Sequence, residues 1–120
     1  MGDRDLTRFT PQHRSAAHAA TTTSAPRWFL REAVGVFALS SSDIVVFFAI
    51  ADNLDSAGVS RTANSLITRR TGMSRTTVVK SLATLIDLGL IVELDEKRSG
   101  AIMRYAIPAQ RPLTHREIGI

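Results

Sequence analysis

The hydrophobic positions of the chain predict a central helix that begins near residue 40. Ser40 and Asp43 have the spacing of a capping box, in which the serine oxygen accepts an amide hydrogen and the carboxylate reaches back to the N-cap amide. Leu39 and Ile44 fit the two apolar staple positions around that box. The positions that follow are apolar over most of a helical circumference, namely Ile44, Val45, Val46, Phe47, Phe48, Ile50 and Leu54. We therefore expect this helix to be the most buried one of a small domain.

A second, shorter helix is predicted after a loop that covers residues 55–61. Thr62 is expected to be its N-cap, and the helix runs through Leu66, Ile67 and Arg70. Gly72 can end it in the left-handed conformation, which glycine adopts at the least cost.

A third helix is predicted over residues 74–88, because Ser74 can cap it and Met73 with Val78 can form its staple pair. On a helical wheel Val78, Leu82, Leu85 and, at the edge, Ile86 share one face, while Thr76, Lys80 and Thr84 lie on the other. Gly89 then provides a glycine stop after which Leu90 can contact Leu85.

The next segment alternates between apolar and polar positions and predicts a hairpin. Val92 and Leu94 belong to its first strand, and Ile102, Arg104, Tyr105 and Ile107 belong to its second. Residues 95–100 form a polar loop that contains a glycine. Lys97 and Arg98 at its tip are suited to a DNA backbone or minor groove, whereas Asp95 and Glu96 beside them oppose that role. Both alternatives stay open.

Three further segments complete the division of the chain. Residues 27–39 are apolar, contain the only Trp and have a period that fits a helix or a strand; they either complete the core of a monomer or form a surface for a second copy. Residues 1–26 are expected to be a disordered or weakly helical tail, and residues 109–120 a C-terminal tail without a clear signal. The expected fold is mainly α with a small β-hairpin, an α+β domain over residues 27–108.

Composition fits one small globular domain with a local excess of positive charge. The chain has 120 residues, of which 44% are hydrophobic, and a net charge of +4. Between Ser56 and Ile86 there is no acidic residue, although five basic residues fall there: Arg61, Arg69, Arg70, Arg75 and Lys80. This distribution permits binding to a polyanion.

Several classes of function are disfavoured. The chain has no cysteine, so it has no disulfide and no thiolate metal site, which is consistent with a cytoplasmic location. Its longest apolar stretch, residues 44–51, is far too short to span a membrane. All three histidines lie in the tails and there is no glycine-rich phosphate loop. We therefore expect no enzyme activity, no catalytic or metal-binding residue and no cofactor.

The exposed face of the third helix carries six basic or hydroxyl residues, with no acid among them. Its members suit a helix that lies against phosphates and base edges in a major groove: Arg75, Thr76, Thr77, Lys80, Ser81 and Thr84. This pattern predicts double-stranded DNA as the partner.

From Leu39 to Ile107 the chain resembles the winged helix-turn-helix domains of phage and plasmid replication proteins and of MarR- and GntR-like regulators. The residues that carry the resemblance are Leu39-Ser40-x-x-Asp43, Ile50-Ala51-Asp52, Leu66-x-x-Arg69-Arg70-Thr71-Gly72-Met73-Ser74-Arg75-x-Thr77-Val78, Leu82, Leu85, Leu88-Gly89-Leu90-Ile91 and Tyr105. Several relatives carry a glutamate or glutamine where this chain has Asn64 and Ser65, which affects a capping contact and not the fold.

The resemblance implies roles for individual residues in DNA binding. Arg75 and Lys80 suit guanine edges or phosphates, Thr76, Thr77 and Ser81 suit phosphates, and Ser74 at the helix N-terminus can meet a further phosphate. Arg61, Thr62 and Arg69 are candidates for contacts that position the DNA backbone. The implied function is that of a sequence-specific transcriptional regulator, which we expect to bind an inverted repeat as a homodimer. The alternatives are a replication, excision or partition factor of a phage or plasmid, and a winged helix that binds a protein partner.

Overall fold

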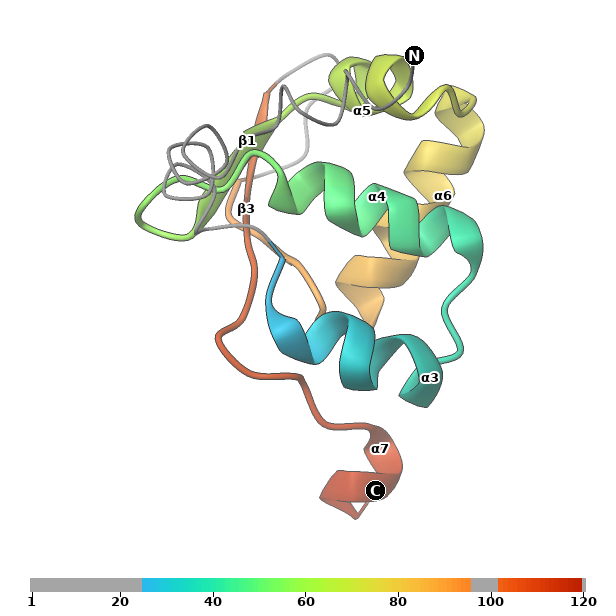
Figure 1. Ribbon diagram of the computed structural model, residues 1–120, viewed down its shortest axis with the longest axis vertical. Coiled ribbons are helices and arrows are strands. Elements are labelled where there is room, and N and C mark those ends of the chain that lie inside the picture. The colour runs from blue at the N-terminus through green and yellow to red at the C-terminus, as the bar shows by residue number, and fades with distance from the viewer. Residues whose placement is uncertain (1–24, 96–101, 120) are drawn as a thin grey trace, which may run out of the picture.

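The computed structural model describes residues 25–95 and 102–119. The elements in chain order are η1 (Phe29–Ala33), α3 (Val34–Val36), α4 (Ser41–Ala51), β1 (Val59–Thr62), α5 (Asn64–Thr71), α6 (Arg75–Asp87), β2 (Val92–Glu93), β3 (Met103–Ala106) and α7 (His115–Ile118). Helices α3 to α6 lie to one side of one small sheet in the view of Figure 1, so the expected combination of a mainly helical fold with a small β-structure is confirmed.

The central helix, α4, begins where its capping box predicts. The Asp43 amide donates to Ser40 Oγ and the Ser40 amide donates to Asp43 Oδ2, both at 3.1 Å. The helix packs against α5 and α6, and Val46, Phe47 and Ile50 on it are fully buried. The prediction of a buried central helix is confirmed.

The apolar segment before α4 is helical and packs onto it. A π-helical turn, η1, continues directly into α3. The ring of Phe29 stacks on that of Phe47 with centroids 3.7 Å apart and planes within 2°, and both rings are buried. The segment therefore contributes to the core, while Leu30 and Val36 on it stay exposed.

The structure corrects the prediction for residues 55–62, because they contain a strand as well as a turn. Asp55 Oδ1 accepts hydrogen bonds from the amides of Ala57 and Val59 and so closes the turn that leads into β1. The N-cap position of α5 is Ala63 and not Thr62. Thr62 is the last residue of β1, where its side chain is buried and bonded to other side chains.

The three strands form an antiparallel sheet in the order β1-β3-β2. Val59 of β1 and Val92 of β2 both lie opposite Ala106 of β3, which confirms the predicted pairing of the two strands after α6. Met103 and Tyr105 on the central strand point into the core. The tip of this hairpin, with Lys97 and Arg98, lies outside the described residues.

The helix pair α5 and α6 has the predicted boundaries at its turn and at its end. Gly72 follows α5 with a φ of 73°, and the Thr77 amide donates to Ser74 Oγ at 3.2 Å to cap α6. At the end of α6 the Leu90 amide donates to the Leu85 carbonyl and the Gly89 amide to the Ile86 carbonyl, which is a Schellman motif. The inward face predicted for α6 is confirmed, since Val78, Leu82 and Leu85 are buried.

The C-terminal segment is ordered by interactions that the sequence analysis did not identify. Thr114 and Glu117 form a second capping box, at α7. Arg111 bonds to Glu117 and also to Glu32 in η1, and so joins the two ends of the described chain. No helix among residues 25–95 and 102–119 is long and apolar enough to cross a membrane.

Candidate nucleic-acid interface

The N-terminal half of α6 presents the main polar surface of the candidate interface. Ser74, Arg75, Thr76 and Lys80 are exposed, as the helical wheel predicts. Their direction is set by the buried face of the helix, because residues on opposite sides of a helix cannot both contact its core. Ser74 is the N-cap of α6. At this end of a helix, backbone amides without a partner in the helix attract negative charge.

Two threonines of this helix, Thr77 and Thr84, are only half-exposed, and each makes a local hydrogen bond. The Ser74 hydroxyl donates to Thr77 Oγ1 at 3.0 Å. The Thr84 hydroxyl donates to the carbonyl of Lys80 at 3.1 Å. Both threonines still border the exposed face, and each hydroxyl oxygen retains a lone pair that can accept a further hydrogen bond.

Two of the predicted site residues are buried and are removed from the candidate interface. Ser81 is 3% exposed and Thr62 is 1% exposed. Ser81 lies three residues after Val78 and one before Leu82, so the 3.6-residue period places it on the inward face of α6. Thr62 is buried because its strand alternates and Thr62 shares the inward side with Ser60.

Four cations around the helix pair are exposed and have no ion pair within the described part of the chain. They lie on β1, α5 and α6 and are Arg61, Arg69, Arg75 and Lys80. Arg70 differs, since its Nη1 donates to Asp52 Oδ2 at 3.0 Å and to Asn53 Oδ1 at 3.2 Å. The charge of Arg70 is therefore paired, whereas the other four side chains form no ion pair. Among these four, Arg61 lies near enough to Asp55 to help the hydrogen bond from the Val59 amide lower the pKa of that carboxyl group.

The stem of the hairpin is clamped by an ion pair between the start of its loop and β3. Arg104 donates from Nη2 to Asp95 Oδ1 at 2.8 Å and from its backbone amide to Asp95 Oδ2 at 3.0 Å. Hydrogen bonding and charge attraction from Asp95 raise the pKa of Arg104 above its ordinary value. In the sequence, the negative charge of Asp95 opposes DNA binding by the hairpin tip. In the structure, the carboxylate of Asp95 is paired with Arg104. Asp95 lies two residues past the end of β2, so this pair joins the start of the hairpin loop to β3.

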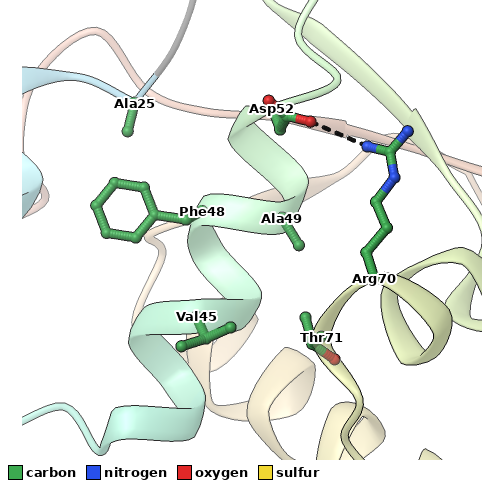
Figure 2. Close-up of a pocket in the computed structure, with 7 residues that line it drawn as sticks. All are labelled: Ala25, Val45, Phe48, Ala49, Asp52, Arg70 and Thr71. Atoms are coloured by element: carbon green, nitrogen blue, oxygen red, sulfur yellow. Dashed lines mark hydrogen bonds and ion pairs between the residues drawn. The ribbon is translucent and has the colours of Figure 1, made fainter. Parts of the chain in front are cut away.

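The structure also has an apolar groove between α4 and the end of α5, with a volume of about 460 Å³ (Figure 2). Val45 and Phe48 form its apolar wall, and the Asp52–Arg70 ion pair lies at its rim. None of the four cations without an ion pair lines it. The groove is therefore chemically unlike a phosphate-binding surface and is separate from the exposed face of α6.

Residues 25–95 and 102–119 contain no group of three or more His, Asp or Glu side chains placed to hold a metal ion. Comparisons with protein-family models, with curated proteins and with solved structures found no significant match to the chain.

Proposed function

We propose that the protein is a sequence-specific double-stranded DNA-binding protein of the winged helix-turn-helix type that acts as a transcriptional regulator. Three features support the proposal. Helices α4, α5 and α6 pack on one another. A glycine turn joins α5 to α6, and the β2–β3 hairpin follows α6 directly. These are the parts that a three-helix core with a wing requires.

The observation that carries the proposal is a set of exposed cations that form no ion pair, on a stretch of sequence without an acidic residue. They are Arg61, Arg69, Arg75 and Lys80, and none forms an ion pair among the described residues. Exposed cations commonly pair with carboxylates or face bulk water, so their gathering around a capped helix favours a polyanionic ligand. A duplex also offers base edges that hydroxyl and guanidinium groups can distinguish.

In the proposed complex, α6 enters the major groove. Arg75 and Lys80 contact guanine edges or phosphates, Thr76 and Thr77 contact phosphates, and the N-terminus of α6 at Ser74 faces a further phosphate. Thr84, farther along the same face, reaches the backbone only at the edge of the groove. Arg61 and Arg69 position the backbone. The wing, with Lys97 and Arg98, contacts the backbone or the minor groove.

Selection of binding sites from a pool of random duplexes tests this proposal. We expect one sequence motif to be enriched, and the selected duplex to bind at least about a thousandfold more tightly than a scrambled duplex at the same salt concentration. A pool without enrichment, together with equal affinity for selected and scrambled duplexes, would contradict sequence-specific binding. A single-stranded pool processed in parallel controls for simple attraction to a polyanion.

A further inference from the structure

A chain of side-chain hydrogen bonds links β1 to the last turn of α5 through Asn53, which follows the C-cap of α4. Asn53 Nδ2 donates to Thr62 Oγ1 at 3.0 Å, and Thr62 Oγ1 lies 2.8 Å from Ser60 Oγ. On its other side Asn53 Oδ1 accepts from Arg70 Nη1 at 3.2 Å. No other side-chain hydrogen bond of the described residues joins β1 to α5.

The directions of these bonds follow from the chemistry of the groups. A guanidinium group can only donate, so Asn53 must present its oxygen to Arg70 and its amide nitrogen to Thr62. Thr62 Oγ1 then accepts from Asn53, and in the bond between Thr62 and Ser60 either hydroxyl can be the donor. In this chain of hydrogen bonds, Asn53 alone donates a hydrogen bond to the sheet and accepts one from α5.

The inner half of this chain is buried, whereas its outer end reaches solvent. Ser60 and Thr62 are almost fully buried. Arg70 is 46% exposed on its side chain and is also held by Asp52, as Figure 2 shows. A buried hydroxyl without a partner costs about 1–3 kcal/mol, so the bonds of Ser60 and Thr62 are strongly favoured. Surface ion pairs contribute little to stability. The orientation of the Arg70 side chain therefore depends on its hydrogen bond to Asn53 as well as on its ion pair with Asp52.

Hydrophobic packing and hydrogen bonding constrain the sheet and the helices in different ways. Burial of apolar area is not itself directional, and the close packing of the core limits the angle between these elements only through the shapes of the side chains. Hydrogen bonds have preferred directions and therefore restrict that angle. The link through Asn53 joins β1, which pairs with the wing strand β3, to the helix that precedes the turn into α6.

We propose that Asn53 is a positioning residue that fixes the orientation of the sheet β1-β3-β2 relative to the helix pair α5–α6. This orientation does not depend on a ligand. Its effect on DNA binding, however, rests on the proposed function. The wing and the recognition helix can contact the same duplex only at one relative orientation. Loss of the Asn53 hydrogen bonds is therefore expected to weaken DNA binding although every phosphate-contacting residue is still present.

Residual dipolar couplings of backbone amides in the full-length chain test the orientation without DNA. In the wild type we expect one alignment tensor to fit the amides of β1, β3, α5 and α6. We expect Asn53→Ala and Thr62→Val to require separate tensors for the sheet and for the helix pair. Thr62→Val keeps the side-chain shape in case Asn53→Ala fails to fold. Asn64→Ala is the matched control, because no hydrogen bond of the Asn64 side chain occurs among the described residues. One shared tensor in both test variants would overturn the proposal.

Binding to the selected duplex tests the consequence. Asn53→Ala is expected to bind about two- to thirteenfold more weakly than the wild type, because a net hydrogen bond is worth ~0.5–1.5 kcal/mol. The slope of affinity against salt should stay unchanged, since no phosphate contact is removed. Separate tensors with unchanged affinity would overturn this consequence. If the wild type binds no duplex, the proposed function fails, and the couplings still decide whether Asn53 sets the orientation.

Discussion

Arg69 and Arg70 show how neighbouring side chains of the same type differ in what they offer a ligand. Both are exposed near the end of α5, yet Arg70 is bonded to Asp52 and Asn53 while Arg69 has no ion pair within the described residues. A paired guanidinium must give up its partner before it can bind a phosphate. The availability of a cation therefore depends on partners that lie far away in the sequence and that a charge count does not show.

Helical periodicity was sufficient to predict part of the candidate site. It identified Arg75, Thr76 and Lys80 as exposed, because their positions follow from the buried face of a single helix. Ser81 was assigned to the exposed face because its side chain is polar, although the helical period places it on the inward side, where it is buried. The partner of Arg104 became evident only from the pairing of β2 with β3.

The first prediction concerns the cations of α6. Arg75→Ala and Lys80→Ala should each weaken binding to the selected duplex while leaving the melting temperature nearly unchanged. A lost base contact costs ~1–3 kcal/mol, and a lost phosphate contact lowers the salt slope by about 1. Fluorescence anisotropy across a salt titration measures both. Arg116→Ala, which removes an exposed charge from α7, is the control; an equal effect of all three substitutions would indicate nonspecific attraction only.

The second prediction concerns the inward face of the same helix. Leu82 is 5% exposed, so Leu82→Ala should lower the free energy of unfolding by ~2–5 kcal/mol through lost burial and a new cavity. Urea denaturation followed by circular dichroism measures the change. Ala83→Ser at the neighbouring exposed position is the control. An equally small change of the urea midpoint in both variants would contradict the assignment of Leu82 to the buried face of α6.

At the scale of elements, the ends of helices were predicted more successfully than the strands. The capping box at Ser40, the glycine turn at Gly72, the Ser74 cap and the Schellman motif at Gly89 are all confirmed, because each depends on residues within a few positions of one another. Strand β1 was missed for two reasons. Its inward side chains, Ser60 and Thr62, are polar, and its partner β3 lies far along the chain.

The C-terminal segment shows that a local signal can also be overlooked. Thr114 and Glu117 have the same capping-box spacing as Ser40 and Asp43. What the sequence did not show is that Arg111 reaches Glu32 in η1, because that contact joins the two ends of the described chain. The side chain of Pro112 also lies close to Gly89, so the segment runs past the end of α6.

The third prediction follows from the acid–base behaviour of this segment. The hydrogen bonds from Arg111 and then from the Thr114 amide lower the pKa of Glu117 from 4.5 to about 2. A lowered pKa means that the ionised form stabilises the segment above pH 4.5, and that this contribution is lost as the pH falls toward 2. An NMR titration of the Glu117 carboxyl carbon should report this low midpoint.

Glu117→Gln provides the comparison for that titration. In this variant the amide signals of α7 should no longer change between pH 4.5 and 2 as they do in the wild type. A Glu117 midpoint at its ordinary value would mean that Arg111 does not hold the carboxylate in solution.

At the scale of the whole molecule, the helical segment before α4 has one buried face and one exposed face. Phe29 and Ala33 belong to the core, whereas Leu30 is 65% exposed and Val36 is 50% exposed. The packing that completes the core therefore leaves apolar area on the outside of the same segment. Exposed apolar area of this kind is a candidate contact surface for a second copy.

The fourth prediction is a symmetric dimer that binds an inverted repeat with half-sites about 10 bp apart. Sedimentation across micromolar concentrations should show self-association that is lost on replacing Leu30 and Val36 with serine, with the fold retained. Leu113→Ser changes an exposed leucine in the C-terminal segment and serves as the control. A monomer that protects one asymmetric half-site in a footprint is the result that excludes this prediction.

The most direct test of the central claim is an NMR titration of the full-length protein with the selected duplex, followed through backbone amide shifts. We predict that the largest changes fall at residues 74–80 of α6, with further changes at Arg61 and Arg69, and that the Val45–Phe48 wall of the apolar groove changes little. Changes concentrated at that wall, with the amides of α6 unaffected, would contradict the assignment of α6 as the DNA-binding element.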